Sequence, residues 1–200
     1  MGNSKGWDVI RLDALFNVGS SKRIYQREQT SSGIPFLRIS DLVQRIATGE
    51  ESCELFISEN QFLDFCKKGL VPEPGDILVT SRGTLGMCYI VQKNDRFYFQ
   101  DGMISWLHKK SPDVNTRYIS YLFQLTGFRK QIDEVPTGST VNYLSLSRLA
   151  KLNVMYPPIE LQDRFITIVE AADKSKFAIQ QALDETQRLF DSLMAEYFEA

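Results

Sequence analysis

The stretch from Leu161 to Glu199 contains neither glycine nor proline, and helix-forming residues dominate it. Its apolar residues recur in a heptad-like register, and eight of the ten positions in that register are apolar. This pattern predicts one uninterrupted helix with a coiled-coil seam, about 58 Å long at the usual α-helical rise. The seam combines Phe165, Ala172, Ile179, Thr186 and Leu193 with Val169, Lys176, Leu183, Phe190 and Tyr197.

The apolar stripe of this helix is wider than a strict seam, because further apolar residues flank it. A body of ordinary size has too little surface to cover such a length, so partner protein is expected along the helix. Two copies of the chain present the same surface, which predicts a two-fold homodimer. A helix folded back on its own body is less favoured, because Pro157 and Pro158 fall where a projecting arm would begin. The predicted partner interface consists of Phe165, Val169, Ala172, Ile179, Leu183, Phe190, Leu193 and Tyr197.

The sequence before these two prolines indicates short strands, tight turns and a few helices. Lys93–Asp95 is expected to turn a hairpin, and Gly127 is expected to end the first of the helices. The chain is therefore predicted to be α+β, with a mixed, β-rich domain over residues 1–160 and a long helix over residues 161–200. Strands are predicted at 34–39, 77–80, 87–92, 96–99, 104–108 and 152–155, and helices at 116–124 and 145–149.

Composition excludes several classes of protein. Apolar residues make up 43% of the chain and charged residues 24%, which is ordinary for a globular protein. The net charge of −2 offers no bulk attraction to nucleic acid or membrane. Three separated cysteines and one histidine do not form a zinc motif, and free thiols favour a reducing compartment. No apolar run suits a signal peptide or a membrane span, so a cytoplasmic protein without a membrane partner is expected.

A search for catalytic motifs returns negatives. The sequence contains no phosphate-binding P-loop, no dinucleotide-binding glycine motif and no nucleophile elbow. Tyr156–Ile159 contains two prolines but lacks the polar residue that an amino-methyltransferase places before them. Asp76 and Asp101 lie at turns without the partner residues of a nuclease site. The chain is therefore predicted to be no enzyme and to hold no cofactor or metal of its own.

Three turns concentrate small polar and basic groups instead. They lie at 19–23, at 80–86 directly after a predicted strand, and at 137–143. Hydroxyls, backbone N–H groups and cations hold phosphates, while arginine and asparagine also read base edges. Each turn taken alone is more often only a turn, but three in one small domain suggest nucleic-acid binding. The candidate DNA-binding residues are Ser21, Lys22, Arg23, Arg38, Ser81, Arg82, Thr84, Ser139, Thr140, Asn142 and Tyr143.

The order of these segments resembles the target recognition domain of type I restriction-modification specificity subunits. The resemblance covers essentially the whole chain. It departs from the family's usual pattern at Leu161, where a glutamate commonly precedes the glutamine. The segments that carry it are Trp7–Phe16, Gly33–Leu42, Pro74–Gly86, Gln100–Ile104, Gly138–Ser145 and Pro157–Gln162.

The resemblance implies a non-catalytic subunit that binds one half of a two-part double-stranded DNA target. It implies a methyltransferase subunit, which uses S-adenosylmethionine, and an ATP-driven restriction subunit as partners. Subunits of this kind usually carry two recognition domains and two helices, and this chain has one of each. It therefore resembles a half-subunit or a fragment. A protein–protein adaptor built around the long helix stays open as an alternative, and a degraded DNA enzyme is a third, less favoured one.

Overall fold

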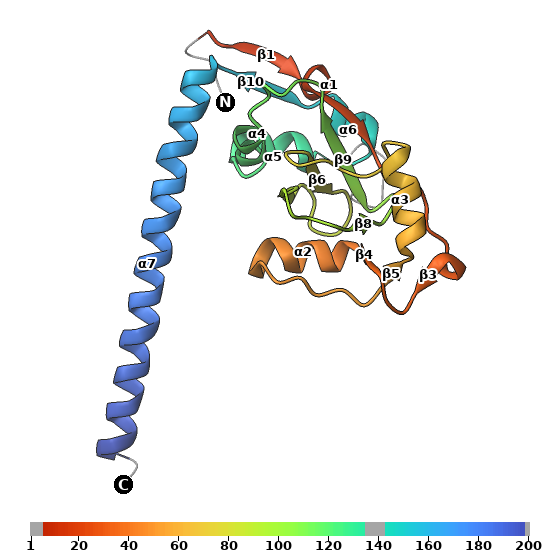
Figure 1. Cartoon of the computed structure of the whole chain (residues 1–200). Coiled ribbons are helices and arrows are strands. Elements are labelled where there is room, and N and C mark those ends of the chain that lie inside the picture. The colour runs from red at the N-terminus through yellow and green to blue at the C-terminus, as the bar shows by residue number, and fades with distance from the viewer. Residues whose placement is uncertain (1–5, 135–142, 199–200) are drawn as a thin grey trace. The chain divides into compact units, whose positions relative to one another are not determined.

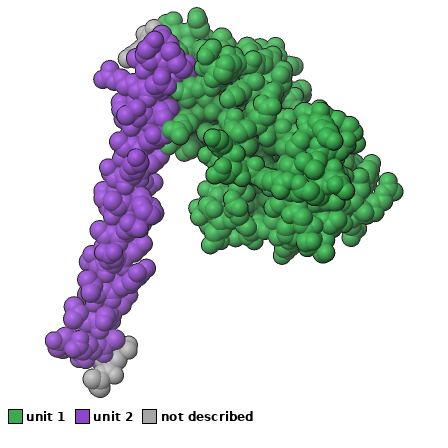
Figure 2. Space-filling view, in the orientation of Figure 1, with its two compact units in different colours: residues 1–157 green, residues 158–200 purple. Residues whose placement is uncertain are grey.

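A computed structural model describes residues 6–134 and 143–198 of the chain. The chain divides into two compact units, Met1–Pro157 and Pro158–Ala200, which Figure 2 shows in green and purple. The division falls between the two prolines of the sequence. The first unit is called the body below, and helix α7 of the second unit is called the arm.

The arm is one helix, α7 (Ile159–Phe198), of 40 residues. It begins two residues before the predicted start, directly after Pro158, which is a favourable residue at the entry to a helix. Its length is about 60 Å at the α-helical rise. Every residue from 171 to 198 is exposed, including the apolar seam residues Ile179, Leu183 and Leu193.

A four-stranded sheet in the described part of the body has the order β2-β9-β6-β7. Figure 1 labels its two inner strands, β9 and β6. The two inner strands β9 and β6 run antiparallel to each other, with Thr80 opposite Ile104, and β2 runs antiparallel to β9, with Gly19 opposite Trp106. The strands are β2 (Phe16–Gly19), β9 (Ile104–Lys109), β6 (Ile77–Thr80) and β7 (Cys88–Ile90).

A second sheet has the order β3-β5-β4-β8, and its β4 and β8 are parallel neighbours, with Leu37 opposite Phe99. A separate two-stranded ribbon joins β1 to β10, with Asp8 opposite Tyr156. These strands are β3 (Gln29–Thr30), β5 (Phe56–Ile57), β4 (Ile34–Leu37), β8 (Tyr98–Phe99), β1 (Asp8–Arg11) and β10 (Asn153–Tyr156).

Helices surround these sheets, and three of them begin at a side-chain cap. Ser58, Asn115 and Ser145 each accept a hydrogen bond from the backbone N–H three residues on, which satisfies a donor that the helix leaves open. The helical segments of the body are α1 (Leu12–Leu15), the 3-10 turn η1 (Gln26–Glu28), α2 (Ile39–Thr48), α3 (Glu59–Lys67), α4 (Thr116–Leu122), α5 (Thr126–Asp133) and α6 (Leu146–Ala150).

Two hydrophobic clusters of the described part of the body meet around β4 and β8. One packs aromatic side chains of α3 and β8, including Phe65 and Tyr98, whose ring centroids lie 4.7 Å apart. The other includes Leu78 of β6 and Phe99 of β8, which belong to different sheets. All four side chains are buried, so this packing holds the strands β6 and β8 in position.

The α+β prediction is confirmed, but several details were wrong. The strand predicted at 34–39 ends at Leu37, and Arg38, expected within it, is the N-cap of α2. The predicted hairpin around Lys93–Asp95 does not form, because β7 pairs with β6 while β8 pairs in parallel with β4. Gly127 does not end a helix but lies inside α5.

Candidate nucleic-acid interface

Three polar segments meet at one edge of the β2-β9-β6-β7 sheet. Since β2 and β6 both run antiparallel to β9, their carboxyl ends lie beside the start of β9. Hydrogen bonds tie the segments together there. The hydroxyl of Ser20 donates to the carbonyl of Ile104 at 3.0 Å and accepts from the N–H of Gly102 at 3.3 Å. We call this edge, made of residues 20–23, 81–84, 100–103 and Tyr143, the loop edge.

Ser81 joins the remaining parts of the loop edge. Its N–H donates to the carbonyl of Met103 at 2.8 Å, and its own carbonyl accepts from the N–H of Leu144 at 3.0 Å. The hydroxyl is buried and pairs with that of Ser105 at 2.6 Å. Ser81 therefore holds the loops together, and its hydroxyl faces the protein rather than solvent.

The loop edge displays cations from two different turns. Lys22 and Arg23 follow β2, and Arg82 follows β6, and all three side chains are exposed. The guanidinium of Arg82 lies 4.9 Å from the ring centroid of Tyr143, in a cation–π contact. Thr84 and Ser21 complete the described candidates here, although the hydroxyl oxygen of Ser21 is buried, so the fold brings six of the predicted residues and Ser81 to one place.

Arg38 lies beside this edge but is occupied. Its neighbour Leu37 ends β4 and accepts the N–H of Gln100 at 2.9 Å, which places Arg38 next to the end of β8. The guanidinium donates to Asp41 at 3.1 Å and to Glu54 at 2.9 Å. These two carboxylates raise the pKa of Arg38, chiefly through the hydrogen bond and charge of Asp41. Ser139, Thr140 and Asn142 lie outside the described residues.

Asp101 belongs to the site, although the sequence indicates only a turn around it. Arg23 donates from Nε to the carboxylate of Asp101 at 2.9 Å, across 78 positions of the chain. The hydrogen bond and the negative charge of Asp101 raise the pKa of Arg23. Only the turn around Asp101 was visible in the sequence, since the pairing depends on β2 and β9 lying side by side.

Asp76, the other acidic residue noted at a turn, is a structural acceptor. It is fully buried and accepts from the indole N–H of Trp106 at 2.8 Å and from the backbone N–H of Glu73 at 2.9 Å. The only histidine, His108, places Nδ1 3.0 Å from the same carboxylate. Among the described residues, no group of three or more histidine, cysteine or acidic side chains could hold a metal ion.

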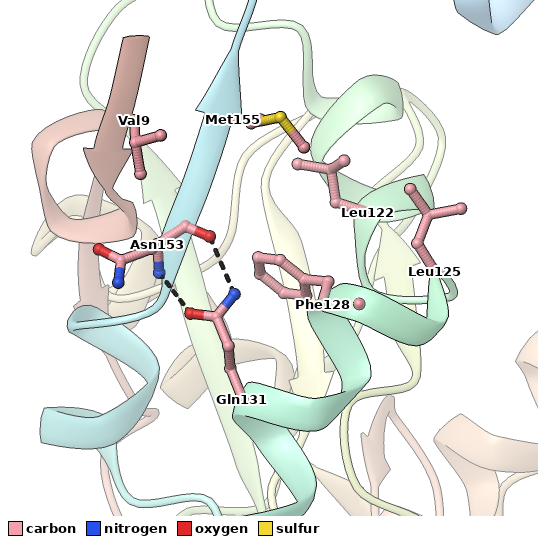
Figure 3. Close-up of a pocket in the computed structure, with 8 residues that line it drawn as sticks. Val9, Leu122, Leu125, Phe128, Gln131, Asn153 and Met155 are labelled. Atoms are coloured by element: carbon pink, nitrogen blue, oxygen red, sulfur yellow. Dashed lines mark hydrogen bonds between the residues drawn. The ribbon is translucent and has the colours of Figure 1, made fainter. Parts of the chain in front are cut away.

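The body also contains an apolar pocket away from the loop edge. A pocket of about 150 Å³ lies between α4, α5 and the β1–β10 ribbon, lined by Val9, Leu122, Phe128 and Met155 (Figure 3). At its rim, the side-chain amide of Gln131 accepts a hydrogen bond from the N–H of Asn153 at 2.9 Å and donates one to the carbonyl of Asn153 at 3.1 Å. The pocket therefore offers no free catalytic group.

The chain belongs to the family of type I restriction modification DNA specificity domains, whose model matches residues 4–186. It is similar to a putative type I restriction enzyme specificity subunit of Haemophilus influenzae, with 26% identity over 188 residues that cover 92% of this chain and 46% of the relative. It is also similar to the MjaIX specificity subunit of Methanocaldococcus jannaschii, with 26% identity over 84% of this chain and 38% of that subunit.

Solved structures share the fold. A chain of a type I R-M system, solved to explain complex assembly and conformational transition, aligns with a TM-score of 0.69 and 16% identity, over 96% of this chain and 45% of that one. The HsdS subunit of Thermoanaerobacter tengcongensis aligns with a TM-score of 0.66 and 15% identity, over 99% and 46%. This chain thus spans less than half the length of the relatives it matches.

No helix within residues 6–134 and 143–198 is long and apolar enough to cross a membrane.

Proposed function

We propose that this chain recognises one half of a two-part DNA sequence as a specificity subunit, or half of one, in a type I restriction-modification system. The observation that carries the proposal is the loop edge, where Lys22, Arg23 and Arg82 come from two turns to one exposed surface. Membership in a family of DNA specificity domains supports DNA as the ligand of this surface. The adaptor alternative gives these cations no role.

The proposed partners follow from the same family. A methyltransferase subunit with S-adenosylmethionine and a restriction subunit with ATP would act on the DNA that this chain selects, and the chain itself would catalyse nothing. The cytoplasm, where DNA is accessible, is the proposed location. Isothermal calorimetry should detect no saturable binding of S-adenosylmethionine to the isolated chain, and saturable binding would contradict this part of the proposal.

The proposed assembly is a homodimer through the arm. The exposed seam supports it, because an apolar stripe of this length left in water marks an interface. An antiparallel pair of arms about 60 Å long would hold two bodies more than one DNA turn of about 34–36 Å apart. The target would then be an inverted repeat with an unread spacer.

A gel shift tests the DNA-binding function. Random duplex DNA is titrated at low salt with the full chain, alone and with a cognate methyltransferase subunit. We expect binding that weakens steeply as salt is raised, because neutralised phosphates release counterions. Residues 1–160 carry 19 basic and 17 acidic side chains, so the affinity of the chain alone for DNA should be modest. No binding in either setting would favour the adaptor.

A further inference from the structure

Among the described residues, Arg23 differs from the other arginines around the loop edge in how its donors are used. Arg148 spends both terminal nitrogens on backbone carbonyls, and Arg38 divides its guanidinium between two carboxylates. Arg23 gives only Nε, to Asp101. Its two terminal nitrogens make no recorded hydrogen bond within the described chain, and its side chain is 66% exposed.

The carboxylate that holds Arg23 is itself fixed. The side chain of Asp101 is 21% exposed, and the backbone is anchored on both sides of it. On one side the N–H of Gln100 donates to Leu37 at 2.9 Å, and on the other the N–H of Gly102 donates to Ser20 at 3.3 Å. Asp101 can therefore restrict the guanidinium plane of Arg23 to a narrow range of directions.

We propose that Arg23 reads a guanine of the half-target through its two terminal nitrogens, and that Asp101 is the positioning residue that presents them. This inference rests on the proposed DNA-binding function and adds the base that is read. Guanine shows two adjacent acceptors, O6 and N7, in the major groove, and these match the paired N–H groups of an arginine. A bond from Nε leaves that pair of nitrogens available.

The charge of the pair favours a base over a phosphate. Arg23 and Asp101 together are neutral, so a phosphate approaching the guanidinium also meets the carboxylate. A base edge carries no net charge, so the carboxylate repels it less than it repels a phosphate. The second carboxylate oxygen of Asp101 is an acceptor, which suits the amino group of a neighbouring cytosine or adenine. Arg82 lies against Tyr143 and pairs with no carboxylate within residues 6–134 and 143–198, so nothing there steers it toward a base rather than a phosphate.

Selection from a randomised duplex library tests the inference. The full chain with its methyltransferase subunit is compared with Arg23→Lys, Asp101→Asn and the control Asp13→Asn. Asp13 pairs with Arg11 in another exposed ion pair and lies near Lys110, beyond the opposite end of β9. We expect the native chain and Asp13→Asn to prefer guanine at one position by about 5- to 100-fold. Asp101→Asn should lose most of that preference while still binding DNA, and Arg23→Lys should lose all of it.

Replacing that guanine with 7-deazaguanine sharpens the test, because it removes only the N7 acceptor. The native chain should bind the modified duplex several-fold more weakly, and Arg23→Lys should bind both duplexes equally. An unchanged base preference in Asp101→Asn, or a loss in Arg23→Lys that is equal for all sequences, overturns the inference but leaves DNA binding intact. Failure of the native chain to bind any duplex overturns the proposed function itself. Equal melting temperatures of Asp101→Asn and Asp13→Asn exclude misfolding as the cause.

Discussion

The body and the arm contain the same types of apolar residue, but the body buries them and the arm exposes them to solvent. In the body, Leu78 and Phe99 are fully buried between strands. In the arm, Leu183 and Phe190 are more than half exposed, as is every apolar seam residue beyond Ala172. The body therefore satisfies its hydrophobic residues internally, whereas the arm carries a surface whose burial depends on another helix.

The largest expected effect belongs to the arm. Leu183→Asp with Phe190→Asp should abolish the proposed dimer, because four large side chains per dimer lose roughly 1.5–3 kcal/mol of burial each. Light scattering should then show half the native mass. Gln181→Asp with Ala195→Asp adds the same charge away from the seam and should leave the mass unchanged. Native mass in the seam variant would remove the arm as an interface.

The next largest effect is expected from replacing a buried phenylalanine of the body, compared with an exposed phenylalanine of the arm. Phe99→Ala should lower the free energy of unfolding of the body by about 3–5 kcal/mol, because a buried ring is replaced by a cavity. The matched change Phe177→Ala, at a ring 65% exposed on the arm, should cost less than about 0.5 kcal/mol. Urea unfolding of both variants, followed by near-ultraviolet circular dichroism of the body, measures the difference. Equal losses would mean that the arm is part of the core.

The loop edge offers a smaller effect that leaves folding untouched. Arg82→Ala should weaken DNA binding by about 1–3 kcal/mol and relax the preference at one base pair, if the guanidinium contacts a base edge. A loss that is the same for all sequences would assign Arg82 to a phosphate. Arg188→Ala removes the same charge from the arm, and its base preference should match that of the native chain. Gel shifts on a set of single-base variants provide the readout.

The smallest effect near neutral pH concerns tyrosines of the body. Burial raises the pKa of Tyr98 to about 12 and that of Tyr118 to about 12. The unfolded chain ionises these groups near pH 10, so their contribution to stability is complete below about pH 10 and is lost as the pH rises toward 12. Urea midpoints should fall slowly above about pH 8.5, because burial also raises the pKa of the Cys53 and Cys88 thiols, and more steeply above about pH 10. In Tyr98→Phe the fall should be shallower, and an unchanged slope would contradict the assignment.

Local signals explain which parts of the fold the sequence predicts. The arm follows from one unbroken periodic pattern of apolar residues, without glycine or proline. The parallel pairing of β4 with β8 does not, because each has only a few residues and its partner lies some sixty positions away. The false hairpin around Lys93–Asp95 came from assuming that neighbouring strands pair with each other.

The candidate site divides in the same way. Its cations were visible as residues in polar turns, so Lys22, Arg23 and Arg82 could be named in advance. Their environment was not visible, because the burial of Ser81 and the pairing of Arg23 with Asp101 arise only when distant strands align. Residue type therefore indicates candidates for DNA contact, and topology decides how each side chain is held.

The ribbon of β1 and β10 has a consequence for how the chain is made. Asp8 finds its partner only when Tyr156 has been synthesised, so the body cannot close until its last strand is available. Such distant pairings slow folding, because a long loop must be ordered first. The next 40 residues, which form α7, take roughly 2–8 s to translate at 5–20 residues per second. The body therefore leaves the ribosome before the arm, so its apolar groups can be covered before the seam of the arm meets a second copy of the chain.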